Sequence, residues 1–258
     1  MVTISAHQII RDGVKYHFPF IESFLAVEPI VDEFVFCEGF STDGTYEKLL
    51  ELQKQYPNKI KIFREKWYET NPKWMIFADL TNRCIEKCQS TWHWQIEGDE
   101  IYHEKDLSLI KQLTEDKEAD WYSFGMHRLC YNTFDKICND RGPDYNRNLK
   151  RIKMARKSTY PYIHNPKGFT LQDVLGNYKG KDVSDKIKIF HYSYTRHPKV
   201  FQLKANFMMK TYFTEDKRFS GDKPPEYLEL WSEDKTLPFT QPHPAVMKDW
   251  MEKERKGE

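Results

Sequence analysis

The sequence has no long hydrophobic run. No stretch of about 18 consecutive apolar residues occurs, so we expect no transmembrane segment. The first residues, MVTISAHQIIRDG (1–13), have neither a basic start nor an extended apolar core, and a charge follows already at Arg11. We therefore expect no signal peptide and a cytoplasmic protein.

Cysteine is scarce and unpaired. The chain has 5 cysteines, an odd number, and none of them form a C-x-x-C pair. Cys84 and Cys88 lie close together on a predicted helix, where zinc or disulfide chemistry is an alternative. Reduced, buried thiols of a cytosolic protein explain the pattern better.

Neither sign of charge is in excess. Lysine and arginine number 40, aspartate and glutamate number 39, and the formal net charge is +1. The basic segment 147–157 could be a solvated face or an RNA-binding stretch, but no wider basic field accompanies it. We therefore expect no nucleic-acid partner.

Apolar and aromatic residues, in contrast, are plentiful. Hydrophobic residues make up 39% and aromatic residues 15% of the 258 positions, which allows a sizeable core and argues against wholesale disorder. The sequence contains no internal repeat and no low-complexity segment. Its length suits one large domain, or one domain with an extension.

The first hundred residues alternate strand and helix patterns. Strand patterns occupy 2–6, 31–39, 59–63 and 92–96, and helical patterns occupy 14–28, 45–56 and 74–89. Such alternation predicts an α/β fold with a Rossmann-like, mostly parallel sheet and helices on both faces.

The second half is less regular. Strand patterns are found at 120–131, 147–156 and 186–196. From about residue 200 the chain is rich in aromatic residues, charge and proline. Within it, KPPEYLELW (223–231) and LPFTQPHP (237–244) predict an extended wrap, followed by a short charged helix at 245–255. We therefore expect a catalytic domain over 1–205 and a C-terminal extension over 206–258 that packs on it.

Three short segments lie at the carboxyl ends of predicted strands. They are Ala6–His7, Glu38–Gly39 and Glu97–Asp99, the last within WHWQIEGDE. Ligands of parallel α/β sheets bind beyond the carboxyl ends of the strands. The acidic EGDE segment alone would indicate a solvated turn, but its place at a strand end favours a site for a divalent cation.

Two of these segments carry a resemblance. EGFSTDGT (38–45) and QIEGDE (95–100) resemble, in order and spacing, two motifs of the family-two glycosyltransferases with the A-type nucleotide-sugar fold and an Asp-X-Asp motif. The likeness extends over about 2–205, is greatest over 11–106, and is absent from the tail. Glu38 and Glu97 depart from the family's aspartates but keep a carboxylate.

The resemblance implies a metal centre. Asp99 would hold Mn²⁺ or Mg²⁺, and His191, in FHYSYTR, would complete the site; a buried, hydrogen-bonded histidine is the alternative for His191. Glu97 would support the ribose or sugar. Arg151 and Arg196 would neutralise the diphosphate, because the guanidinium fork matches phosphate geometry.

The resemblance also implies a nucleotide pocket. Ala6 and His7 would follow the first strand, where His7 contacts the base or is a structural histidine. Glu38 would face the base and ribose, whereas Asp43 would stabilise the turn. Asn82, placed at the start of the third helix, would line the donor pocket or serve in helix packing.

The catalytic base is less clearly marked. Asp173, in GFTLQDV, lies about where many relatives have a carboxylate, and Asp144 is the second candidate. Glu100 would approach the sugar or acceptor, or interact with the following helix.

Together these features predict a glycosyltransferase. It would move a sugar from a nucleotide-diphosphate donor to an acceptor hydroxyl of a carbohydrate or another molecule, with metal and with inversion. A non-catalytic nucleotide-sugar binding module is the alternative. Nucleotidyl transfer ranks last, because no glycine-rich phosphate loop follows the first strand. The aromatic tail would cover an acceptor groove or a homodimer interface.

Overall fold

Four parallel strands form the first half of the sheet, in the order β3-β2-β1-β4. The computed structural model describes residues 3–70, 73, 75–130, 132–139, 150–157, 178–212 and 235–257. The elements of this half are β1 (Ile4–Ile10), α1 (Phe20–Val27), β2 (Glu33–Glu38), α2 (Thr45–Gln55), β3 (Ile60–Arg64), α3 (Met75–Lys87) and β4 (Trp92–Gln95).

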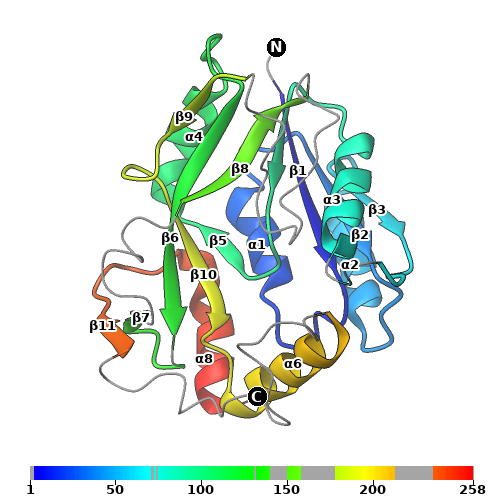
Figure 1. Ribbon diagram of the computed structural model, residues 1–258, viewed down its shortest axis with the longest axis vertical. Helices are drawn as coiled ribbons and strands as arrows, with labels where there is room; N and C mark the ends of the chain where they lie inside the picture. Colours follow the sequence, from blue (N-terminus) through cyan, green and yellow to red (C-terminus); the bar gives the residue numbers. More distant parts are fainter. Residues whose placement is uncertain are drawn as a thin grey trace.

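The second half of the sheet is mixed. Its elements are β5 (Glu100–Tyr102), η1 (Glu104–Asp106), α4 (Leu107–Leu113), β6 (Trp121–Cys130), β7 (Lys136–Cys138), β8 (Lys150–Arg156), β9 (Gly180–Asp182), β10 (Lys188–Tyr194), α6 (Pro198–Thr211), β11 (Thr236–Pro238), η6 (Ala245–Met247) and α8 (Lys248–Lys256). β8 joins β4 to β6 through antiparallel pairing on both sides, and β10 runs parallel to β6 and antiparallel to β5 (Figure 1). The predicted α/β fold is confirmed.

Helices cover both faces of the parallel strands, as expected. Alternate residues of a strand point to opposite faces. In β2, Phe34 and Phe36 belong to the main core cluster together with Phe24 of α1. Cys37 instead belongs to a second cluster, which contains Cys84 and other residues of α3. α1 and α3 therefore pack on opposite sides of the sheet.

Two boundaries and the place of one residue differ from the expectation. β1 continues to Ile10, so Ala6 and His7 lie inside the strand and not after its end. The first helix begins only at Phe20, because the preceding segment is a turn in which Asp12 and His17 have φ values of 52° and 48°. Asn82 lies inside α3 and not at its start.

The helix α6 was not predicted from the sequence. Pro198 occupies the first turn of this helix, where proline is well tolerated. Phe201 is its one buried residue, and Leu203 is 45% exposed.

The C-terminal helix packs on the rest of the fold. Met247, Trp250 and Met251 belong to the main core cluster. The buried carboxylate of Glu254 lies 2.6 Å from Nδ1 of His17 and accepts a hydrogen bond from the His197 backbone. α6 runs across residues 205 and 206, and the division of the chain at that point remains a prediction.

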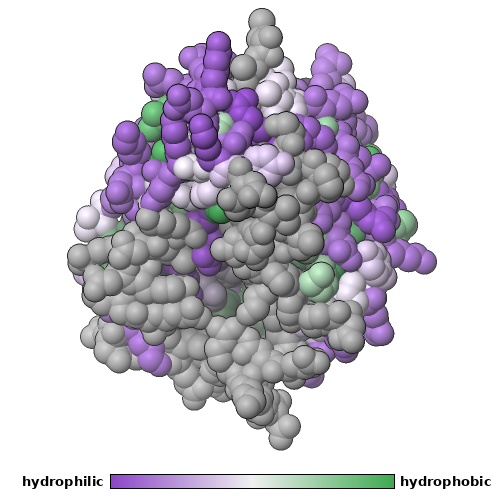
Figure 2. All heavy atoms as spheres, turned by 45° about the horizontal axis from the view of Figure 1, so that its top comes forward, coloured by the Kyte–Doolittle hydropathy of each residue, from purple (hydrophilic) through white to green (hydrophobic). Residues whose placement is uncertain are grey.

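The face of the molecule shown in Figure 2 is mainly polar where its residues are described. On the face shown in Figure 2, hydrophilic side chains dominate the described residues, and hydrophobic ones are scattered. Among the described residues, no helix is both long enough and apolar enough to span a bilayer.

Candidate active site

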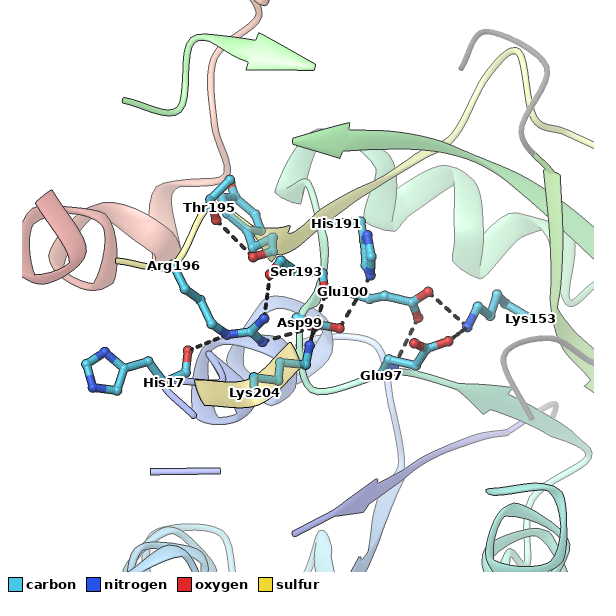
Figure 3. Close-up of polar contacts among 11 residues, drawn as sticks. His17, Glu97, Asp99, Glu100, Lys153, His191, Ser193, Thr195, Arg196 and Lys204 are labelled. Atoms are coloured by element: carbon cyan, nitrogen blue, oxygen red, sulfur yellow. Dashed lines mark hydrogen bonds and ion pairs between the residues drawn. The ribbon is translucent and has the colours of Figure 1, made fainter. Parts of the chain in front are cut away.

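The acidic segment after β4 lies at the centre of a polar cluster. Glu97, Asp99 and His191 each offer one ligand atom, and these atoms all lie within 4.8 Å of one another. β10 brings His191 here, because its register places His191 opposite Glu100 of β5 (Figure 3). The structure thus brings together Asp99 and His191, which the resemblance places around a metal, and adds Glu97, which was expected to support the ribose or sugar.

Asp99 is buried and surrounded by cations. Its Oδ2 accepts a hydrogen bond from Nη2 of Arg196 at 3.0 Å and one from Nζ of Lys204 at 3.2 Å. Burial alone would raise the pKa of Asp99, but Lys204, His191 and Arg196 hold that pKa well below its usual value. The carboxylate is therefore ionised at every physiological pH.

His191 lies on the other side of the same carboxylate. Its Nε2 is 3.6 Å from Oδ1 of Asp99. Burial lowers the pKa of His191 to about 3, so the imidazole is neutral and can act as a ligand. Two ligand atoms that each lie about 2.1 Å from an ion can be at most about 4.2 Å apart. The separation of Asp99 and His191 therefore fits a shared divalent ion.

The donor set suits Mn²⁺ or Mg²⁺ as well. Carboxylate oxygens are the preferred ligands of both ions, and imidazole is common among the ligands of transition metals. Because Arg196 and Lys204 both contact Oδ2 of Asp99, Oδ1 remains on the side of His191. The residues present thus fit the metal that the resemblance implies.

A buried lysine holds the two flanking glutamates. Nζ of Lys153, on β8, lies 2.7 Å from Glu97 and 2.9 Å from Glu100. Burial, with the nearby charge of Glu97, raises the pKa of Glu100. The Glu100 side chain is fully buried and accepts a hydrogen bond from the Glu97 backbone, so in this geometry it orders the turn and does not meet an acceptor. Its catalytic role remains a prediction.

The guanidinium of Arg196 is already engaged by protein groups, although the resemblance assigns it to the diphosphate. Its fully buried guanidinium donates to Asp99, to the His17 carbonyl and to the Ser193 carbonyl, and it lies over the Phe18 ring. Arg151 lies on β8, opposite Phe124 of β6. For both arginines the phosphate role remains a prediction.

Glu38 organises the turn after β2. Its carboxylate accepts hydrogen bonds from the backbone of Phe40 and Ser41, and it pairs with Nε of Arg64 at 2.6 Å. These partners account for both of its oxygens, although the sequence places it against the nucleotide. Asp43 stabilises the same turn as expected, with hydrogen bonds from the backbone and hydroxyl of Thr45.

The remaining pocket residues lie further from the strand ends. Ala6 and His7 are buried within β1, and the His7 ring centroid is 5.6 Å from that of His93. Asn82 lies on α3, with its Oδ1 buried. Asp173 and Asp144 lie outside the described residues. The binding or catalytic roles of these residues stay predictions.

The sequence did not reveal two lysines of the cluster. Alternation along NLKRIKM puts Lys153 on the strand face opposite Ile152 and Met154, which is typical of a solvent-facing residue, whereas the structure buries Lys153 completely. Lys204 gives no signal either, because it lies on the helix that the hydrophobic pattern did not predict.

The chain matches no protein-family model and no curated protein sequence. Among solved structures, the mannosyltransferase PcManGT from Pyrobaculum calidifontis, in complex with GDP-Man and Mn²⁺, is similar with a TM-score of 0.53 and 10% identity, over 88% of this chain and 66% of that one. TarS 1–349 from S. aureus, in complex with UDP-GlcNAc, has a TM-score of 0.50 and 14% identity, over 81% and 67% of the two chains.

These similarities concern part of the larger proteins. The chain spans 40% of the chain in one structure of S. aureus TarS and 66% of TarS 1–349. At such low identities the comparison shows the fold: the chain has the α/β fold of these glycosyltransferases.

Proposed function

We propose that this protein is a metal-dependent glycosyltransferase. It transfers a sugar from a nucleotide-diphosphate donor to an acceptor hydroxyl, with inversion. The observation that carries the proposal is the group formed by Glu97, Asp99 and His191 beyond the carboxyl end of β4. Two proteins of similar fold support it, because one is in complex with GDP-Man and Mn²⁺ and the other with UDP-GlcNAc.

The chain's own residues prepare the site in three ways. Arg196 orients Asp99 through Oδ2, which leaves Oδ1 toward His191. Neutral His191 needs no proton loss before it binds an ion. Lys153 fixes Glu97 at the edge of the group, where the Glu97 side chain is 25% exposed. A divalent ion held there would stabilise negative charge on the departing diphosphate.

The acceptor hydroxyl then attacks the anomeric carbon from the face opposite the leaving group, and a carboxylate takes its proton. Asp173 remains the proposed base, with Glu100 as the other residue assigned to catalysis. In the geometry described above, Glu100 has no exposed side-chain atom with which to reach an acceptor. A cytoplasmic location, a homodimer and a hydroxyl acceptor belong to the proposal as predictions.

A thermal-shift screen tests donor binding. UDP, GDP, ADP and CDP are each added to the wild-type protein with and without Mn²⁺. We expect one nucleotide to raise the melting temperature in a metal-dependent way, because the ligand binds the folded state alone. Asp99→Ala should abolish this shift and sugar transfer. Full activity of Asp99→Ala in the presence of metal would refute the assignment.

A non-catalytic nucleotide-sugar binding module is the second candidate. The complete burial of Glu100 favours this candidate, because a buried carboxylate cannot take a proton from an acceptor. A module without a catalytic base would still hold the metal through Glu97, Asp99 and His191 and would still bind the donor. Hydrolysis or transfer of a nucleotide sugar would exclude this alternative. Metal-dependent binding without any turnover of the bound donor would favour it.

A further inference from the structure

Lys204 reaches the candidate metal group from a different element than the other residues. It lies on α6, and its ammonium contacts Oδ2 of Asp99 at 3.2 Å and Oγ of Ser193 at 3.0 Å. The same ammonium lies 4.5 Å from the ring centroid of Phe18. A second cation therefore shares the carboxylate oxygen that already accepts from Arg196 (Figure 3).

Arg196 and Lys204 differ in burial and in how many contacts hold their charged groups. Arg196 is fully buried, and its guanidinium has three acceptors. The Lys204 side chain is 14% exposed and carries a compact charge on a flexible stem. Lys204 is therefore the less constrained of the two cations beside Asp99.

Metal binding would change the charge balance here. With Arg196 and Lys204 beside Asp99, a divalent ion would be a third cation at one carboxylate, and like charges in a buried site repel strongly. A diphosphate brings several negative charges to the same ion. It would thus attract the cation that the metal repels.

The position of α6 places Lys204 on the correct side of the sheet. In Figure 1, α6 lies across the end of the sheet toward which β1 and β10 run. Phe207 of α6 stacks on Tyr16, in the turn that follows β1, with ring centroids 5.5 Å apart. Ligands of parallel α/β sheets bind at this edge.

We propose that Lys204 binds the diphosphate of the donor, and that it moves from Asp99 to the phosphate oxygens when metal and donor bind. This inference rests on the proposed function. It assigns to α6 the phosphate contact that the sequence assigns to Arg196.

Calorimetric titration tests the assignment. The nucleoside diphosphate selected by the thermal-shift screen and its nucleoside are titrated, with Mn²⁺, into the wild type and Lys204→Gln. Glutamine can still donate hydrogen bonds to Asp99 and Ser193 but has no charge. We expect the diphosphate affinity to fall about ten- to hundred-fold, as for a lost charged hydrogen bond, and the nucleoside affinity to stay unchanged. Lys210→Gln, exposed on the same helix, should bind both as the wild type does.

Two results would overturn the inference while the proposed function stands. One is an unchanged diphosphate affinity of Lys204→Gln; the other is an equal loss for nucleoside and diphosphate, which would indicate a general effect on the pocket. A wild-type protein that binds neither ligand would refute the proposed function itself.

A measurement on the unaltered protein covers the case in which Lys204→Gln fails to fold. Amine acetylation followed by mass spectrometry reports the reactivity of Lys204 and Lys210. Saturating diphosphate with Mn²⁺ should protect Lys204 several-fold and leave Lys210 unchanged. Equal reactivity of Lys204 with and without ligand would contradict the proposal.

Discussion

Nη2 of Arg196 lies 3.0 Å from Oδ2 of Asp99, and both side chains are buried. The pair joins the segment after β4 to the segment between β10 and α6. The guanidinium also donates to the carbonyls of His17 and Ser193. A buried ion pair is tolerated when its remaining donors are satisfied, and here they hold Asp99 in one orientation.

Removal of Arg196 should therefore destabilise the fold. Arg196→Met leaves Asp99 with Lys204 alone and two carbonyls without their donor, and we expect a loss of about 3–5 kcal/mol in the free energy of unfolding. Urea denaturation measures it. Arg83→Met is the control, because the partly exposed Arg83–Glu65 pair should contribute less than about 1 kcal/mol. Similar stabilities of Arg196→Met and Arg83→Met would show that the buried pair contributes no more to the free energy of unfolding than the Arg83–Glu65 pair.

Lys153 should matter in the same way for the two glutamates. Lys153→Met leaves Glu97 and Glu100 without their shared cation, and we expect a loss of about 3–5 kcal/mol in urea denaturation. Glu100→Gln introduced into Lys153→Met should restore part of this stability, because it removes one of the two acids. Lys181→Met, on an exposed pair with Asp116, should be nearly neutral. If the stability effects of Lys153→Met and Glu100→Gln simply added in the double variant, the two residues would not be coupled.

His191 should contribute to metal affinity. His191→Gln removes the imidazole 3.6 Å from Asp99, and we expect Mn²⁺ affinity in the presence of nucleotide to fall at least about ten-fold. The electron paramagnetic resonance signal of free Mn²⁺ measures it. His127→Gln is the control: His127 lies on β6 with its ring against Phe190 and Phe239. Unchanged Mn²⁺ affinity in His191→Gln would remove His191 from the metal site.

Gly39 should tolerate no larger side chain. A Cβ at this position would lie 2.6 Å from Nε1 of Trp67 and 2.7 Å from Cβ of Arg11, so the end of β2 would have to move. We expect Gly39→Ala to cost about 1–3 kcal/mol in urea denaturation. Gly44→Ala meets no atom within 4 Å and should cost less, from its φ of 93° alone. If Gly39→Ala proved as stable as the wild type, the close approach would not be rigid.

Glu33 should make stability depend on acid pH. Burial alone would raise its pKa, but hydrogen bonds from Lys61, Ser5 and the Gln89 backbone lower the pKa of Glu33 below its usual 4.5. A lowered pKa in the folded state contributes stability above the unfolded pKa, and this contribution disappears as the pH falls through the folded value.

Urea denaturation at pH 3.5 to 7 checks this sign. Glu33→Gln should be less stable than the wild type at pH 7, and the difference should shrink below about pH 4.5 as the carboxylate protonates. A constant difference across this range would show that packing, and not ionisation, carries the effect.

The sequence predicts where Asp99 lies in the fold, but it does not predict which cations contact it. EGDE after a strand pattern indicated a strand-end site, because a strand's direction fixes where its carboxyl end lies. The partners come from β10, from α6 and from the segment between them, which lie far along the chain. Lys204 in particular depends on how α6 packs across the sheet, and local residue patterns do not encode that packing.

Glu38 is a second residue whose position could be predicted from the sequence but whose contacts could not. Its place at the end of β2 can be predicted from the sequence, but its hydrogen-bond partners cannot. Arg64 and two backbone amides of the following turn occupy its oxygens, and this arrangement depends on the pairing of β2 with β3. The predicted nucleotide contact therefore competes with a structural role that emerges only when the strands are side by side.

Local sequence is sufficient for the alternation of strands and helices, for the α/β class and for the acidic segment at the end of β4, because hydrophobic period and turn chemistry act over a few residues. Long-range packing decides which charges meet at Asp99. The energies of such charges depend on burial and on distances of a few ångströms, and these exist only after β10 and α6 have folded onto the sheet.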